Sequence, residues 1–253
     1  MKWGATAAAG LGMALGTLTA IPVPGGRVDR NVAAWAMALA PVVGLLLGGL
    51  AALVLLVAEA VGLPGTLGAA LAVAALAVLT RGLHLDGMAD LADGLGSARP
   101  AAEALEIMRR SDIGPFGVIT LVCVLLIQVL ALGSLAETSW ASAALGVITA
   151  VTAGRLAITW ACTGRVPSAR PEGLGAFVAG TVPVWAAALV TVGLLAVGAG
   201  GMGYALALLA GPAVASGLLW HAIRRIGGIT GDVLGALSET ATTVALLVAA
   251  ATV

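Results

Sequence analysis

Long apolar runs, each about the length of a membrane-spanning helix, recur along this chain from its first residues to its last. A helix needs about 20 mainly apolar residues to cross a bilayer. Only 9% of the residues are charged and 60% are apolar, whereas about a quarter of the residues in a soluble domain are charged. The sequence therefore predicts an all-α, polytopic transmembrane helical bundle that forms a single integral-membrane domain over residues 1–253.

Seven runs are candidates for spanning helices, at residues 32–60, 65–81, 114–136, 140–161, 178–199, 203–223 and 239–253. The last of them is short for a full crossing. Residues 1–20 form a further apolar run, which shows no small-residue cleavage site and is followed by prolines at positions 22 and 24. We therefore expect a retained N-terminal membrane helix or re-entrant segment rather than a signal peptide.

The polar connections between these runs alternate in charge. Arginine occurs in the connections at 24–31, 82–113, 162–177 and 224–238. The connections at 61–64, 137–139 and 200–202 contain neither Lys nor Arg. Lys and Arg concentrate on the cytoplasmic side of a membrane, so seven spans would place all the arginine-bearing connections in the cytoplasm. The net charge of zero gives no basic excess that would indicate a nucleic-acid partner.

Three carboxylates follow the second apolar run. Asp86, Asp90 and Asp93 are spaced by four and three residues, which places them on one face of a helix. Such a cluster repels itself unless a cation neutralises it, and carboxylates suit Mg²⁺, Mn²⁺ or Ca²⁺. A solvated acidic helix face is the alternative, but it is less favoured in a chain with only 12 acidic residues. The nearby His84 is a candidate general base, phosphate donor or metal ligand, although a lone histidine is more often structural.

Two further polar segments carry candidate ligands for phosphate. Arg109 and Arg110 can bind phosphate oxygens, or can anchor the next span at the cytoplasmic surface. In the fourth arginine-bearing connection, residues 227–231 are rich in glycine, so that backbone N–H groups could face an anion. Asp232 follows them and could either join the acidic site or cap a loop. Asp112 is either a further metal ligand or a partner for an arginine.

Three motifs in this order resemble the adenosylcobinamide-GDP ribazoletransferase family, also called the cobalamin synthases. They are GLHLDGMADLADG at 82–94, IMRRSDIGPFG at 107–117 and GITGDVLGA at 228–236, with Glu239 after the last. Weaker similarities lie at 19–24 and 41–44, so the resemblance covers nearly the whole chain. The family often has a basic residue, an acid, Ser and a basic residue in the second motif. Here Arg110 and Asp112 exchange those charges.

The resemblance implies that adenosylcobinamide-GDP and α-ribazole, or its 5′-phosphate, are joined to give adenosylcobalamin, or its 5′-phosphate, with release of GMP. It implies a Mg²⁺-dependent enzyme in the bacterial inner membrane whose active site faces the cytoplasm. Homo-oligomers and association with other membrane-bound nucleotide-loop enzymes stay open. The implied catalytic residues are Asp86, Asp90, Asp93 and His84, and the three aspartates are the implied metal ligands. The implied substrate-binding residues are Arg109, Arg110, Ser111, Gly228, Thr230 and Asp232.

Two other functions are kept as alternatives. A membrane phosphotransferase of the CDP-alcohol type performs an analogous reaction, but the exact spacing of that family and its two further aspartates are not present. A cation-coupled transporter would also carry intramembrane acids. Transporters often contain repeated halves, and this sequence shows no internal repeat.

Overall fold

The computed structural model describes residues 2–24, 26, 28–197 and 201–253, and within these residues every regular element is a helix. The helices are α1 (Lys2–Leu18), α2 (Arg30–Ala38), α3 (Ala40–Ala60), α4 (Gly65–Leu79), α5 (Leu83–Gly96), α6 (Ala101–Ile107), α7 (Pro115–Thr138), α8 (Trp140–Ala161), α9 (Gly173–Val178), α10 (Val184–Val197), α11 (Met202–Ile226) and α12 (Gly231–Thr252). The prediction of an all-α polytopic membrane protein is therefore confirmed.

The number of spanning helices is lower than predicted. Five helices, α3, α7, α8, α11 and α12, are long and apolar enough to cross a membrane, and the bent α4–α5 pair would make a sixth if it is counted as one span. The predicted runs at 65–81 and 178–199 form α4 and α10, which have 15 and 14 residues. Helices of that length reach only about 21 to 23 Å, less than the roughly 30 Å of a bilayer core. Positions 198 and 199 lie outside the described residues.

Two predicted boundaries also move, each for a local reason. The run at 32–60 is divided between α2 and α3 at Leu39, because Pro41 in the first turn of α3 has no N–H to donate to the carbonyl four residues earlier and its ring crowds that carbonyl. The final run begins at Gly231 rather than at 239, so α12 has 22 residues and can span. Its polar first half is tolerated because α12 packs between α5, α7, α8 and α11, away from lipid.

The interior of the bundle contains polar side chains that pair with one another. Gln128 of α7 donates hydrogen bonds to Glu239 (2.9 Å) and to Thr243 (3.0 Å), both on α12. Arg155 of α8 is buried and interacts electrostatically with Glu239. A charge in the hydrocarbon region is costly unless it is paired, so these contacts explain how α8 and α12 carry charges at the centre of the bundle.

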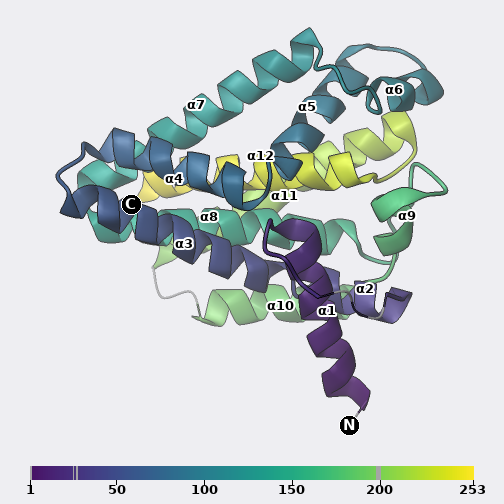
Figure 1. Ribbon diagram of the computed structural model, residues 1–253, viewed down its shortest axis with the longest axis horizontal. Coiled ribbons are helices and arrows are strands. Elements are labelled where there is room, and N and C mark those ends of the chain that lie inside the picture. The colour runs from purple at the N-terminus through teal and green to yellow at the C-terminus, as the bar shows by residue number, and fades with distance from the viewer. Residues whose placement is uncertain (1, 25, 27, 198–200) are drawn as a thin grey trace.

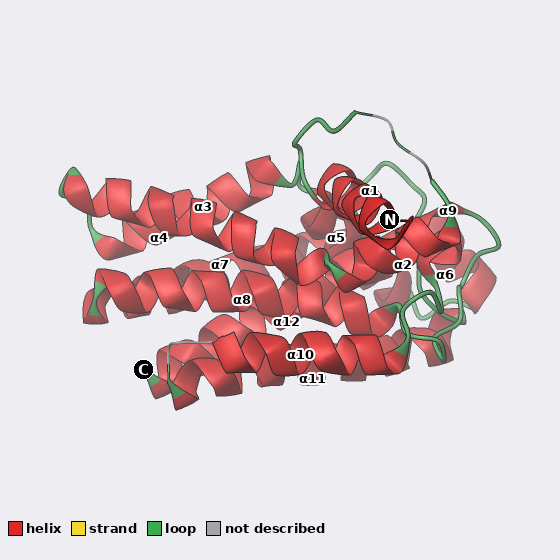
Figure 2. Cartoon of the chain, turned by 90° about the horizontal axis from the view of Figure 1, so that it is seen from below, coloured by secondary structure: helices red, strands yellow, loops and turns green. Residues whose placement is uncertain are grey.

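The polar connections gather at one end of the bundle. Figures 1 and 2 show α3, α8, α11 and α12 running along the long axis, while α1, α2, α5, α6 and α9 lie at the same end. Arg30 at the start of α2 donates hydrogen bonds to the carbonyls of Ala176 and Ala179, which ties α2 to α9. The arginine-bearing connections thus meet at this end, which we call the charged end, except that Arg27 lies outside the described residues.

A sharp turn lays α5 across the charged end. Arg81 and Gly82 adopt left-handed backbone conformations, with φ of 55° and 67°, and α5 leaves α4 at an angle of 88°. Helix α5 then crosses α12 so closely that a Cβ at Gly87 would lie 2.7 Å from the carbonyl oxygen of Asp232 and 2.8 Å from its Cα. Only glycine permits backbones to approach in this way, so position 87 determines how near the acids of the two helices come.

We expect Gly87→Ala to destabilise the protein, because its methyl group would have to push α5 away from α12. Overpacking of this kind costs about 1–3 kcal/mol, and the loss would appear as a lower midpoint of thermal unfolding in detergent. Gly49→Ala is the matched control, since a Cβ at this position of α3 meets no atom within 4 Å. Equal midpoints for the two variants would contradict the close crossing.

Candidate active site at the charged end

A cleft of about 630 Å³ opens between α5 and the segment that precedes α7. It brings together charged and polar side chains from the first two sequence motifs, which α6 separates in the chain, and from the residue just before the first motif. These lining residues are Arg81, Asp86, Asp90, Arg110, Ser111 and Asp112. The structure therefore places several of the predicted metal-binding and phosphate-binding residues around one open space.

Asp86 and Asp90 lie one helical turn apart on the face of α5 that borders this cleft. Asp86 is exposed and Asp90 is half-buried. Burial is the main cause that raises the pKa of Asp90. The charges of Asp86, Asp232 and Asp93 raise it further and that of Arg170 lowers it, so these four side chains are near enough to influence Asp90. Asp232 reaches this group from α12 because α5 and α12 cross at Gly87. The expectation that Asp232 joins the acids from another helix thus agrees with the geometry.

Asp93 is on the same helix but is engaged elsewhere. It is buried, with 8% of its surface exposed, and its Oδ2 and Oδ1 accept hydrogen bonds from the backbone N–H groups of Gly114 (2.7 Å) and Gly117 (3.0 Å). These N–H groups begin α7 and have no partner within the helix, so a carboxylate at this position stabilises the helix start. A Cβ at Gly117 would collide with that carboxylate.

The acidic side chains that remain form a small donor set. Within the described part of the chain, no three His, Cys, Asp or Glu side chains converge as a group that could hold a metal ion. Asp86 and Asp90 do border the cleft with carboxylate oxygens, and Mg²⁺ is commonly held by one or two carboxylates together with phosphate oxygens of a substrate. The donor set therefore fits a magnesium ion that shares its ligands with a bound substrate.

His84 points away from this cleft. Its side chain is 2% exposed, and neither ring nitrogen has a hydrogen-bond partner. It lines a separate apolar cavity of about 20 Å³ together with Leu174 and Leu234. The structure thus does not bring His84 to Asp86 and Asp90, although these three residues share one motif.

The two adjacent arginines differ in their surroundings. Arg110 and Ser111 line the cleft. Both arginines are exposed, but Nη1 of Arg109 lies 3.4 Å from Oε1 of Glu106. The sequence could not distinguish the two side chains, whereas the structure places only Arg110 beside the carboxylates of the cleft.

Residues of the third motif have structural partners. Thr230 caps α12, because its hydroxyl accepts a hydrogen bond from Val233 N–H (3.2 Å) and donates one to Asp232 (3.1 Å). The backbone N–H of Ile229 donates to the carbonyl of Pro167 (2.9 Å) and so does not face an anion. A Cβ at Gly228 would collide with that same carbonyl.

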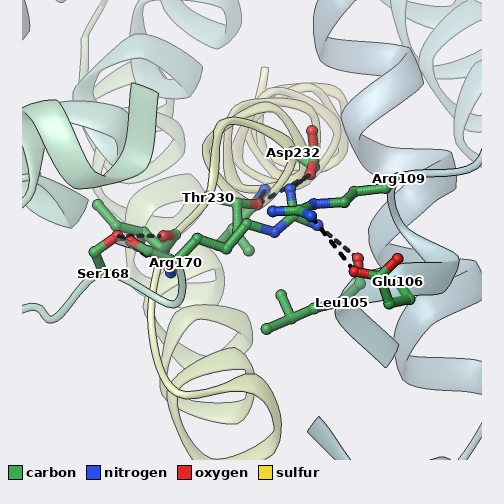
Figure 3. A network of polar contacts seen from close by, with 9 residues as sticks. Leu105, Glu106, Arg109, Ser168, Arg170, Thr230 and Asp232 are labelled. Carbon is green, nitrogen blue, oxygen red and sulfur yellow. Dashed lines mark hydrogen bonds and ion pairs between the residues drawn. The ribbon is translucent and has the colours of Figure 1, made fainter. Parts of the chain in front are cut away.

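Arg170 is a charged residue of the site that the sequence analysis did not single out. Its Nη1 lies 3.8 Å from Oδ2 of Asp232, and its Nη2 donates a hydrogen bond of 2.7 Å to the carbonyl of Leu105 (Figure 3). The side chain is only 17% exposed. In the sequence it resembles Arg165, an exposed arginine of the same connection, and nothing in the local pattern separates the two.

Together these side chains form a cleft that carboxylates share with two arginines and a serine hydroxyl. Carboxylate oxygens bind hard divalent cations, and the arginine guanidinium pairs with phosphate oxygens. The arrangement suits a substrate that brings phosphate groups and a cation together.

Comparisons with known proteins agree with this chemistry. A family model described as cobalamin-5-phosphate synthase matches residues 10–250. An adenosylcobinamide-GDP ribazoletransferase from Frankia casuarinae is 46% identical and is covered over 92% of its length by 93% of this chain. A protein of the same name from Nocardioides sp. is 44% identical, with 94% of this chain and 96% of the relative covered. No solved structure gives a significant match. On this evidence the chain belongs to the cobalamin-5-phosphate synthase family.

Proposed function

We propose that this protein joins adenosylcobinamide-GDP to α-ribazole, or to its 5′-phosphate, and releases GMP, which completes the nucleotide loop of cobalamin. The relatives named adenosylcobinamide-GDP ribazoletransferase support the reaction. The observation that carries the proposal is the cleft in which Asp86 and Asp90 face Arg110 and Ser111. Its groups match the needs of phosphoryl transfer, which depends mainly on positioning and charge neutralisation.

The reaction breaks the phosphoanhydride bond of the diphosphate and forms a phosphoester bond. The 3′-hydroxyl of the ribazole attacks the phosphorus nearest the aminopropanol arm, a new P–O bond forms, and the P–O bond to GMP breaks in line. Arg110 stabilises charge on the phosphate oxygens. We assign the acceptance of the hydroxyl proton to a carboxylate of the cleft rather than to His84, because His84 lines a separate cavity and both of its ring nitrogens are buried.

We further propose that Mg²⁺ takes part. Asp86 and Asp90 would hold it, and when bound it would neutralise the diphosphate and the developing charge on the leaving GMP oxygen. Asp93 contributes indirectly, since it holds the start of α7 in place.

The orientation in the membrane is also a proposal. The arginine-bearing connections meet at the charged end, and such connections concentrate in the cytoplasm. We therefore place the protein in the bacterial inner membrane with the cleft facing the cytoplasm.

Asparagine substitutions should separate the carboxylates that hold the metal from the one that supports α7. We expect Asp86→Asn and Asp90→Asn each to reduce GMP release by roughly a hundredfold or more while the protein remains folded, because they remove ligands of the metal. Asp93→Asn should mainly lower the midpoint of thermal unfolding, since it weakens a helix cap worth about 1 kcal/mol. Full activity in both Asp86→Asn and Asp90→Asn would move the metal site elsewhere.

A comparison of Arg110→Gln with Arg109→Gln should show which arginine contacts phosphate. We expect Arg110→Gln to lower kcat/KM for the corrinoid substrate by roughly 10- to 100-fold, because a charged donor to phosphate is lost. Arg109→Gln should change it by less than about threefold, since an exposed ion pair contributes little. The opposite order would show that Arg109 is the phosphate ligand.

The orientation can be tested with single cysteines in a variant that lacks Cys123 and Cys162. Arg99→Cys lies at the charged end and Val61→Cys at the other end, and both side chains are exposed. In intact spheroplasts a membrane-impermeant maleimide should label Val61→Cys alone, whereas both should be labelled after permeabilisation. Labelling of Arg99→Cys in intact spheroplasts would reverse the proposed orientation.

A further inference from the structure

Arg170 connects two walls of the site that are far apart in the sequence. It lies between α8 and α9, and its side chain extends over the first turn of α12 toward α6 (Figure 3). The hydroxyl of Ser168 donates a hydrogen bond of 2.6 Å to the carbonyl of Arg170, which holds the backbone of this connection. The guanidinium then contacts Asp232 on α12 and Leu105 on α6 at the same time.

The contact with Asp232 balances charge in the site. Asp232 repels Asp86 and Asp90, and Arg170 attracts Asp90 and Asp232. Without Arg170 a third carboxylate without a counter-charge would stand beside the proposed pair of metal ligands. Because Arg170 and Asp232 have side chains that are only 17% and 27% exposed, water screens their attraction less than it screens a surface ion pair.

The contact with Leu105 supports the other wall. The carbonyl of Leu105 is in the last turn of α6, where backbone carbonyls have no partner within the helix. Arg170 supplies that partner with a short, charge-assisted hydrogen bond. The segment that follows α6 carries Arg110 and Ser111 into the cleft, so the position of α6 affects where these two residues stand.

We infer that Arg170 is a positioning residue that ties α6 to α12 and keeps Asp232 from competing with Asp86 and Asp90 for a divalent cation. The second half of this inference rests on the proposed function, because it concerns the proposed metal pair. The first half depends only on the contacts with Asp232 and Leu105.

Two measurements on the full-length protein in detergent, without substrate, test the two halves. The rate at which trypsin cleaves after Arg109 and Arg110 reports how firmly α6 is held. Cleavage requires this segment to open locally, so its rate depends on the population of the opened state. We expect Arg170→Gln to accelerate this cleavage roughly tenfold, because a charge-assisted hydrogen bond is lost. Arg165→Gln, in the same connection, should cleave at the wild-type rate.

Binding of Mn²⁺ can be measured through the electron paramagnetic resonance signal of the free ion. The affinity for Mn²⁺ reports the net charge of the site. Arg170→Gln should bind Mn²⁺ roughly fivefold to tenfold more tightly than wild type, because one opposing positive charge is gone. The double variant Arg170→Gln with Asp232→Asn should return to wild-type affinity. Arg170→Lys should keep wild-type affinity but cleave fast, since one ammonium group cannot reproduce the forked contact of a guanidinium. Arg170→Lys also carries the test if Arg170→Gln does not fold.

The outcomes separate this inference from the proposed function. Cleavage of both Arg170 variants at the wild-type rate would overturn the link between α6 and α12. Unchanged or weaker Mn²⁺ binding by Arg170→Gln would overturn the role in charge balance. Absence of Mn²⁺ binding by the wild-type protein would contradict the proposed metal pair, and the cleavage rates would still decide whether Arg170 positions α6.

Discussion

The close crossing of α5 over α12 is the contact on which the rest of the site depends. Gly87 has no side chain, so the backbone of Asp232 can lie directly against it. This crossing puts the acids of α5 beside Asp232 and leaves Asp86 and Asp90 on the open side of the helix. It also turns Asp93 toward the start of α7, whose position sets the opposite wall of the cleft.

The location of charge explains how so apolar a chain can carry such a site. The acids and arginines of the cleft lie at the charged end, where water and a phosphate-bearing substrate can reach them. The charges deeper in the bundle, Arg155 and Glu239, are on helices that are largely covered by other helices. Gln128 adds hydrogen bonds to Glu239 and Thr243. Lipid therefore meets mainly apolar side chains, while protein encloses the polar ones.

Much of this arrangement could be predicted from the sequence because it follows from hydrophobicity and helical spacing. All seven predicted runs contain helices, and Asp86 and Asp90 face one cleft as their spacing predicts. Within the described residues fewer helices qualify as spans than predicted, because composition does not show that α4 ends at a right-angle turn. The boundary at Pro41 could have been predicted from the proline itself.

Other features depend on tertiary contacts that spacing does not encode. Asp93 has the same periodicity as its neighbours, yet only the arrival of α7 engages its carboxylate. His84 lies on the opposite side of α5 from the cleft, in a cavity formed with residues of distant segments. Arg170 acquires its partners from α6 and α12, which are distant in sequence. For such residues the sequence shows the chemistry of the side chain, but it does not show which groups surround that side chain in the fold.

The most direct test of this account is an assay of the purified wild-type protein in detergent with adenosylcobinamide-GDP and α-ribazole 5′-phosphate. GMP and the joined corrinoid would be quantified by chromatography while Mg²⁺ is titrated from zero. The account predicts that the two products form in equal amounts and that neither forms when a chelator removes the metal. Equal product formation with and without Mg²⁺ would contradict the metal-dependent cleft, and absence of product from folded protein would contradict the proposed reaction.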